Sequence, residues 1–346
     1  MLVFVFFLAL MGPAAAASAR VHVEHLLRAV SLRPSSASSH GRLAARLLVD
    51  RSRHGAAAVA AVAAEYVAAP VRSLHFINLE RDAERRRHMR SQAEWLADGG
   101  VALTRFPAVD GAAASVSGDV ARIFRDTDFA TGPDGGDLDR GVLGCALSHL
   151  ALWRQIARGG GGGGGGQDGE DDSTWWAAVV EDDVELHPRF PDLLRARVAM
   201  LQAADPQWMF LALNGGVNGT RSWETDYTRL SPVAKGGLAI PGLFRVDREM
   251  WLPTTMAYAL SRRGARELVA IAERQGIHRA VDFWVLDFRR ALRLSAAYPP
   301  QLVRHNCTFG SSIVDVGKGD LTVHARHALF SGCGQRKQCK RCWAEN

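Results

Sequence analysis

The stretch WWAAVVEDDVEL at residues 175–186 carries two clues to the fold. Its first half is a short, continuous apolar run, which is typical of a strand that is buried on both faces. The run ends in three consecutive acids, Glu181, Asp182 and Asp183. Acidic triplets also occur in solvated turns. Adjacent carboxylates repel one another, however, so their place directly after a buried strand favours a site for a cation.

Strands and helices alternate on both sides of this stretch. The expected strands are 73–80, 175–180, 208–215 and 254–261, and the expected helices follow Asp82, span 141–158 and follow Ser261. Such alternation predicts an α/β layer fold around a mainly parallel sheet. In sheets of this kind, ligands bind outside the carboxyl ends of the strands.

Composition divides the chain into a central domain, residues 71–325, and flanking segments. Residues 1–19 carry no charged side chain and end in small residues, which indicates a secretory signal peptide or, alternatively, a retained membrane anchor. Residues 20–70 resemble a stem. Residues 159–172 begin with eight consecutive glycines and predict a flexible loop insert. Residues 326–346 form a basic tail rich in cysteine.

The charge balance and the cysteines bear on partners and compartment. The net charge is +6, but the arginines are scattered without interleaved aromatic residues, so we expect no nucleic-acid partner. Membrane contact is expected only through the N-terminus. Four of the five cysteines fall in the last 40 residues, which predicts two disulfides in the lumen of the endoplasmic reticulum or Golgi. Zinc bound by the tail with His327 is the alternative. The disulfide candidates are Cys307, Cys333, Cys339 and Cys342, the glycosylation sequons are at Asn218 and Asn306, and Cys145 is expected to be a free, buried thiol.

A basic cluster follows the first expected strand. Arg81, Arg85, Arg86 and Arg87 crowd the start of a helix, where an anionic ligand would be favoured, although a solvated basic turn is the alternative. Together with the acid triplet, this predicts a site for a diphosphate bridged by Mn²⁺ or Mg²⁺. The common Gly-rich nucleotide-binding motifs are absent from the sequence.

Several motifs resemble, in this order, those of glycosyltransferase family 25, which includes bacterial lipooligosaccharide galactosyltransferases and procollagen galactosyltransferases. They are INLERDAERRRHMRSQ (77–92), RFPAVDG (105–111), GVLGCALSHLALWR (141–154), VVEDDVEL (179–186), AYALSRRGARELV (257–269), VDFWVLDF (281–288) and YPPQLVRHNCTFGSSI (298–313).

The resemblance implies a GT-A-type, Rossmann-like fold, a UDP-sugar donor, most often UDP-galactose, a Mn²⁺ or Mg²⁺ cofactor, and inversion at the anomeric carbon. It makes the acid triplet a version of the metal-binding DxD motif. Asp183 is then the direct metal ligand, and Glu181 and Asp182 lie on the metal or on the donor ribose. The implied donor-binding residues are Asn78, Arg81, Arg85, Ser148 and His149, although His149 also suits a packed core position.

Two acids in VDFWVLDF are the candidates for the general base that deprotonates the acceptor. They are Asp282, the first choice, and Asp287; alternatively both acids only cap helices or pair with arginines. The acceptor is a hydroxyl of a glycan or of a protein that contains hydroxylysine. The alternative functions are a catalytically inactive glycan-binding protein of the same fold and a metal-dependent phosphohydrolase.

Overall fold

The computed structural model describes residues 73–115, 117–124, 140–159, 175–213, 230–248, 252, 255–298, 302–306 and 309. The predicted signal or anchor, the stem, residues 160–172 of the insert and the tail lie outside these residues. So do Asn218, Cys307, Cys333, Cys339 and Cys342, and all of these remain predictions. Cys145 is described, and it is a free thiol that is half-buried rather than fully buried.

The helices and strands alternate along the chain, as expected. In chain order they are β1 (Leu74–Asn78), α4 (Ala83–Asp98), β2 (Leu103–Pro107), α5 (Asp119–Ile123), α6 (Arg140–Ala157), β3 (Trp176–Glu181), β4 (Val184–Leu186), α7 (Phe190–Ala204), β5 (Phe210–Ala212), β6 (Ser231–Lys235), β7 (Leu238–Arg245), β8 (Ala257–Ser261), α8 (Arg262–Gln275), α9 (Val281–Asp287), β9 (Ser295–Ala297) and β10 (Val303–His305).

The central element is an eight-stranded sheet in the order β2-β1-β3-β8-β5-β9-β7-β6. β1 pairs in parallel with β2 and β3, and β5 pairs in parallel with β9. β8 runs antiparallel to both of its neighbours, and β7 does the same. The other strands therefore share one direction, which confirms the predicted Rossmann-like α/β class with a mainly parallel sheet. A separate two-stranded sheet joins β10 to β4.

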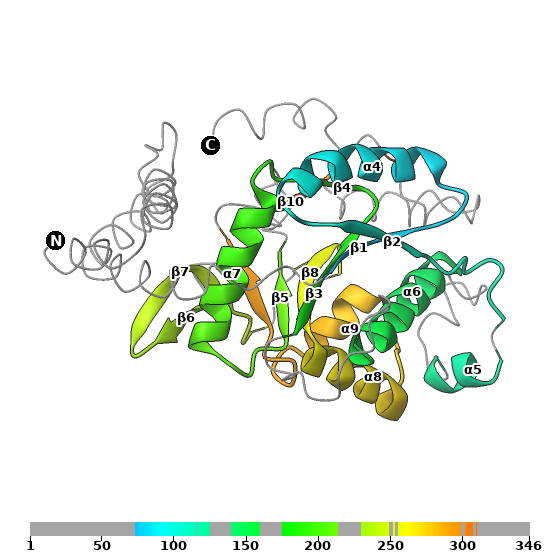
Figure 1. The fold of residues 1–346 in the computed structure, drawn as a ribbon. Coiled ribbons are helices and arrows are strands. Elements are labelled where there is room, and N and C mark those ends of the chain that lie inside the picture. The colour runs from blue at the N-terminus through cyan, green and yellow to red at the C-terminus, as the bar shows by residue number, and fades with distance from the viewer. Residues whose placement is uncertain are drawn as a thin grey trace, which may run out of the picture.

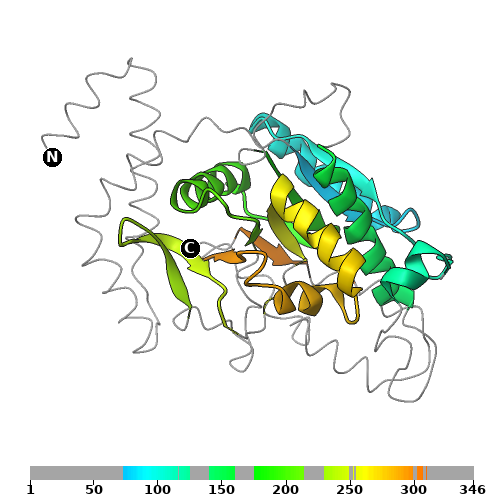
Figure 2. The same ribbon diagram turned by 90° about the horizontal axis from the view of Figure 1, so that it is seen from below.

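Helices cover both faces of the large sheet (Figures 1 and 2). α4 and α7 pack on one face, where the core includes Met89, Leu96 and Leu194. α6, α8 and α9 pack on the other face, where the core includes Trp153, Leu268 and Trp284. β1 and β3 are buried along nearly their whole lengths because both of their faces are covered. This explains why their sequences are continuously apolar rather than alternating.

Local sequence signals explain where α8 begins and ends. Ser261 caps α8, and its Oγ accepts a hydrogen bond of 3.0 Å from the backbone N–H of Gly264. Gly276 follows the last helical residue with a positive φ of 77°, as a glycine just beyond a helix end predicts. Asp82 stands at the expected position before α4, but its side chain makes no capping hydrogen bond.

The start of α6 lies against the loop that follows β2, and two glycines allow this contact. A Cβ atom at Gly144 would lie 2.7 Å from the backbone nitrogen of Gly111. Real Cβ contacts are essentially never this short, so any side chain at Gly144 would push the helix away from the loop. The approach brings α6 beside the carboxyl ends of β1 and β2. Within the part of the chain described, no helix is both long and apolar enough to cross a bilayer.

Candidate functional site

The site is built where the carboxyl ends of β1 and β3 lie side by side. The parallel register pairs Ile77 with Glu181, so the next residues along, Asn78 and Asp182, also become neighbours. Asn78 donates from Nδ2 to Asp182 Oδ2 over 2.7 Å, and both residues are buried. The two ends that the sequence singled out, INLER and VVEDD, therefore meet as predicted from the rule for open α/β sheets.

Arg85 reaches from the first turn of α4 into this junction. Its Nη1 donates to Asp182 Oδ1 over 2.9 Å and lies 3.5 Å from Asp183 Oδ2. The three side chains are between 8% and 12% exposed. Burial raises the pKa of Asp182, and the attraction of Arg85 only partly offsets this effect. Arg85 therefore acts as a buried counter-charge for the acid turn rather than as an exposed contact for phosphate.

Asp182 is consequently an anchor inside the site. One of its oxygens accepts from Asn78 and the other accepts from Arg85, so each carboxylate oxygen is already held by a donor of the chain. Asp182 was predicted as a metal or donor ligand, and this arrangement favours a role in fixing the acid turn instead.

Asp183 lies in the turn between β3 and β4, and a late segment of the chain holds it there. The Asp183 carbonyl oxygen accepts a 2.6 Å hydrogen bond from the Asn306 backbone nitrogen, next to the pairing of β10 with β4. Asn306 itself is only 7% exposed, and its Nδ2 lies 3.5 Å from His88 Nε2. This burial does not favour glycosylation at Asn306, and the sequon there stays a prediction.

Glu181 and two residues of α6 lie together at the other side of β3. Ligand atoms of Cys145, His149 and Glu181 are all within 4.8 Å of one another. The Glu181 side chain is 30% exposed, and its Oε1 lies 3.5 Å from His149 Nε2. Among the described residues, this is the one group of three potential metal ligands whose ligand atoms lie so close together. The acid triplet does not converge in this way.

His149 and Ser148 are buried and take part in internal hydrogen bonds. His149 Nδ1 lies 3.0 Å from Tyr258 Oη, which also accepts a 2.8 Å hydrogen bond from Trp153 Nε1. Burial lowers the pKa of His149 to about 4, so its ring is neutral near pH 7. Ser148 Oγ accepts from the Val109 backbone nitrogen over 2.8 Å, so Ser148 holds the loop after β2 directly and would affect a bound donor only through that loop.

The two candidate bases have different surroundings. Asp282 lies in the first turn of α9, and its Oδ1 accepts hydrogen bonds from the Thr255 backbone nitrogen (2.7 Å) and hydroxyl (2.6 Å). α9 packs on the same face of the sheet as α6, the helix that carries His149. Asp287 forms an ion pair with Arg279 at 3.3 Å, and its Oδ2 lies 3.5 Å from His278 Nε2. Asp282, whose carboxylate is fixed by the Thr255 donors, stays the preferred candidate for the base.

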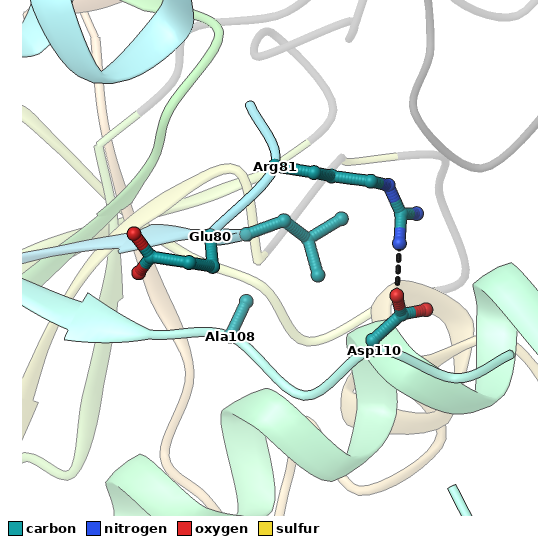
Figure 3. A pocket seen from close by; sticks show the side chains of 5 residues that line it. Glu80, Arg81, Ala108 and Asp110 are labelled. Atoms are coloured by element: carbon teal, nitrogen blue, oxygen red, sulfur yellow. Dashed lines mark hydrogen bonds and ion pairs between the residues drawn. The ribbon is translucent and has the colours of Figure 1, made fainter. Parts of the chain in front are cut away.

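A pocket of about 360 Å³ lies at the carboxyl ends of β1 and β2 (Figure 3). Its lining consists of Leu79, Glu80, Arg81, Ala108 and Asp110.

Arg81 forms an ion pair with Asp110 across the mouth of the pocket. Glu80 is paired with Arg105 at 2.7 Å and with Arg86 at 3.0 Å. Arg81 was predicted at this position. Glu80 and Asp110 were not predicted. The available signal for Asp110 was the segment VDG (109–111), which lies just beyond the end of β2.

The donor atoms at the end of β3 fit a hard divalent cation only in part. Glu181 and Asp183 offer carboxylate oxygens, whereas Asp182 is engaged by Asn78 and Arg85. Ions such as Mn²⁺ and Mg²⁺ commonly take one or two protein carboxylates and complete their shell with phosphate oxygens and water. The residues present therefore suit a cation that arrives with a diphosphate, and they do not form a closed protein cage.

Comparison with known proteins agrees with the motifs. Residues 72–230 match the profile of the family described as glycosyltransferase family 25 (LPS biosynthesis protein). No curated protein matches the chain. The matched segment contains β1, the loop after β2, α6 and the acid turn, which together carry the site described above. Residues 72–230 of this chain therefore belong to glycosyltransferase family 25.

Proposed function

We propose that this protein transfers galactose from UDP-galactose, with inversion, to a hydroxyl of a glycan or of a protein containing hydroxylysine. Membership of the family supports glycosyl transfer as the reaction class. The observation that supports binding of a nucleotide-sugar donor is the junction of β1 with β3. There Asn78 and Arg85 hold the acid turn beside a pocket at the neighbouring strand ends. The apolar residues 1–19 favour the lumen of the endoplasmic reticulum or Golgi as the place of the reaction.

The pocket at the ends of β1 and β2 suits the nucleoside part of the donor. Its volume, about 360 Å³, falls within the range of small-molecule sites. Leu79 and Ala108 supply apolar surface, and Asp110 supplies an acceptor for ribose hydroxyls. Arg81, whose side chain is 46% exposed, can exchange its partner Asp110 for a phosphate oxygen.

Asp183, with Glu181 beside it, would hold Mn²⁺ or Mg²⁺ at the diphosphate. When bound, the cation would stabilise the negative charge that develops on the departing UDP. The chain's own contribution is to fix the acid turn. Asp182 is locked by Arg85 and Asn78, and the Asp183 backbone is held by Asn306, so the turn is ordered before a donor binds.

Asp282 is the proposed base. The two hydrogen bonds from Thr255 fix one of its carboxylate oxygens in place. In the reaction, the acceptor oxygen forms a bond to the anomeric carbon, the bond from that carbon to UDP breaks on the opposite face, and the acceptor proton passes to Asp282. A single displacement of this kind inverts the anomeric carbon and needs one base and no covalent sugar intermediate.

The test uses the full chain with Mn²⁺, a panel of UDP-sugars, and candidate acceptors. We expect UDP release that depends on UDP-galactose and an acceptor, and a rise in melting temperature with UDP and Mn²⁺. Asp183→Asn should abolish both signals. Asp282→Asn should keep the thermal shift but lower turnover by about 10²- to 10⁴-fold. Asp287→Asn is the matched control and should stay near the wild-type rate. No release of UDP from any sugar donor, together with no thermal shift, would refute the proposal.

A further inference from the structure

One group of side chains at the site includes two residues, Cys145 and His149, that have no part in the proposed transfer reaction. Cys145 and His149 lie one turn apart on α6 and therefore on the same face of the helix. Glu181, at the end of β3, faces them. Their ligand atoms lie within 4.8 Å of one another, and no other group of three such ligands converges within the described ranges. Thiol, imidazole and carboxylate form a different donor set from the oxygens of the acid turn.

His149 is oriented as a metal ligand would be. Its Nδ1 is engaged by Tyr258 Oη at 3.0 Å, which fixes the rotation of the ring. Its Nε2 is buried and has no hydrogen-bond partner among the described residues, and it points toward Glu181 Oε1 at 3.5 Å. The residue is 1% exposed. A histidine that binds a metal through one nitrogen usually has the other nitrogen in a hydrogen bond, as here. An unpaired buried nitrogen is otherwise unfavourable.

We propose that Cys145, His149 and Glu181 form a Zn²⁺ site. Sulfur and imidazole ligands favour Zn²⁺ over Mn²⁺ or Mg²⁺, which prefer oxygen. Zn–S and Zn–N bonds are about 2.3 and 2.0 Å long, so two ligand atoms of a tetrahedral site lie roughly 3.5 Å apart. The three ligand atoms here lie within 4.8 Å of one another, so the most distant pair needs to approach by about 1 Å to complete the geometry. The Cys145 thiol loses its proton to solvent as the Zn–S bond forms. Three protein ligands leave one position for water.

The consequence for the enzyme rests on the proposed function. Glu181 belongs to both groups, since it precedes the acid turn and also faces His149. Zn²⁺ bound to Cys145 and His149 would draw Glu181 away from the cation that accompanies the donor. The site would therefore make the transferase sensitive to inhibition by Zn²⁺, without any contact between Zn²⁺ and the nucleotide pocket.

The test of binding uses Co²⁺ alone as the probe, because a Co²⁺–thiolate bond gives a near-ultraviolet charge-transfer band. The reference is the full chain in which the four cysteines after residue 306 are replaced by serine, so that Cys145 is the remaining thiol. We expect one equivalent of Co²⁺ bound through thiolate, displaced by Zn²⁺ and not by Mn²⁺. A folded reference chain that gives no thiolate band overturns the proposal. If the reference chain does not fold, wild type and Cys145→Ser are compared by difference.

Matched variants assign the ligands. Cys145→Ser, with Cys145→Ala as a second form, should remove the thiolate band, and Glu181→Gln should weaken Co²⁺ binding by at least about 10-fold. Asp183→Asn is the control, and it should leave the band unchanged. A band that persists in both Cys145 variants overturns the proposal.

These signals need no transferase activity, so failure of the proposed function and failure of the zinc site are separate results. In the activity assay, each chain is compared with its own zinc-free rate. Cys145→Ser should require at least about 10-fold more Zn²⁺ for half inhibition than wild type. Equal sensitivity of the two chains would refute the inhibitory role.

Discussion

Asp205→Asn should clearly destabilise the fold. Asp205 follows α7 and is 5% exposed. Its Oδ2 accepts hydrogen bonds from Arg245 Nη2 (2.7 Å) and Arg293 Nε (3.0 Å), and its Oδ1 accepts from Arg293 Nη2 (2.8 Å). The carboxylate thereby joins the end of α7 to β7 and to the turn before β9. An asparagine would turn an amide N–H₂ group toward guanidinium donors and leave two arginines close together without a counter-charge.

The size of the effect follows from the exposure of the partners. Removing one partner of a buried ion pair costs about 3–5 kcal/mol. The Arg245 and Arg293 side chains are 25% and 43% exposed, so water can hydrate them in the variant. We therefore expect a loss near the lower end, about 3 kcal/mol. For a domain of this size, that corresponds to a fall in melting temperature of about 6–12 °C.

The pH dependence gives a second signature. Burial acts to raise the pKa of Asp205, but the hydrogen bonds from Arg293 and Arg245 outweigh it, and the net pKa is lowered. A lowered carboxyl pKa stabilises the folded state above the unfolded pKa of about 4, and this contribution is lost as the pH falls through the folded pKa. The stability difference between wild type and Asp205→Asn should therefore be full at pH 7 and shrink below about pH 4.

Urea unfolding of both chains across this pH range measures the difference. Asp192→Asn is the matched control, because Asp192 is 47% exposed and lies 3.8 Å from Arg195. Exposed pairs contribute about 1 kcal/mol or less. Asp205→Asn unfolding within about 0.5 kcal/mol of wild type at pH 7 would show that the two arginines do not depend on this carboxylate.

Three further changes test the packing around the site. Tyr258→Phe should cost about 1–3 kcal/mol, because Trp153 Nε1 loses its acceptor in a buried position; unchanged urea unfolding would contradict the hydrogen-bond assignment. Gly144→Ala should cost about 1–3 kcal/mol, because the new Cβ would lie 2.7 Å from the Gly111 nitrogen; a melting temperature equal to that of wild type would show that α6 does not pack so closely. Glu185→Gln should cost about 1 kcal/mol or less, since its ion pair with β10 is partly exposed; a larger fall in melting temperature would mean that this pair holds the acid turn.

Much of the sheet and of the site could be predicted because the signals are local. The apolar run before Glu181 predicts a strand covered on both faces, and β3 is such a strand. Ser261 predicts the start of α8, because a serine side chain can cap the first turn of a helix. The β6–β7 hairpin was not predicted. Gly236 and Gly237 both have positive φ, at 59° and 81°, and this two-glycine turn was a local signal that went unused.

Other features depend on residues that are distant in sequence. α9 is a short helix, and its Trp284 is buried because it packs in the core that α6 and α8 form on the same face of the sheet. The helical period is not evident in so short and apolar a segment. For the same reason, the sequence could not decide whether Asp282 or Asp287 faces the site.

The sequence by itself determined the class of fold, the acid turn after β3 and the basic segment after β1, because strand propensity and the position of polar residues are properties of short stretches. Only the tertiary structure shows which residues surround each acid. Asp182 is held by Arg85, which is 97 residues away, whereas Glu181 faces His149 on α6. Successive side chains of a strand point to opposite faces, so the adjacent carboxylates of Glu181 and Asp182 enter different surroundings. Their roles follow from those surroundings rather than from the motif.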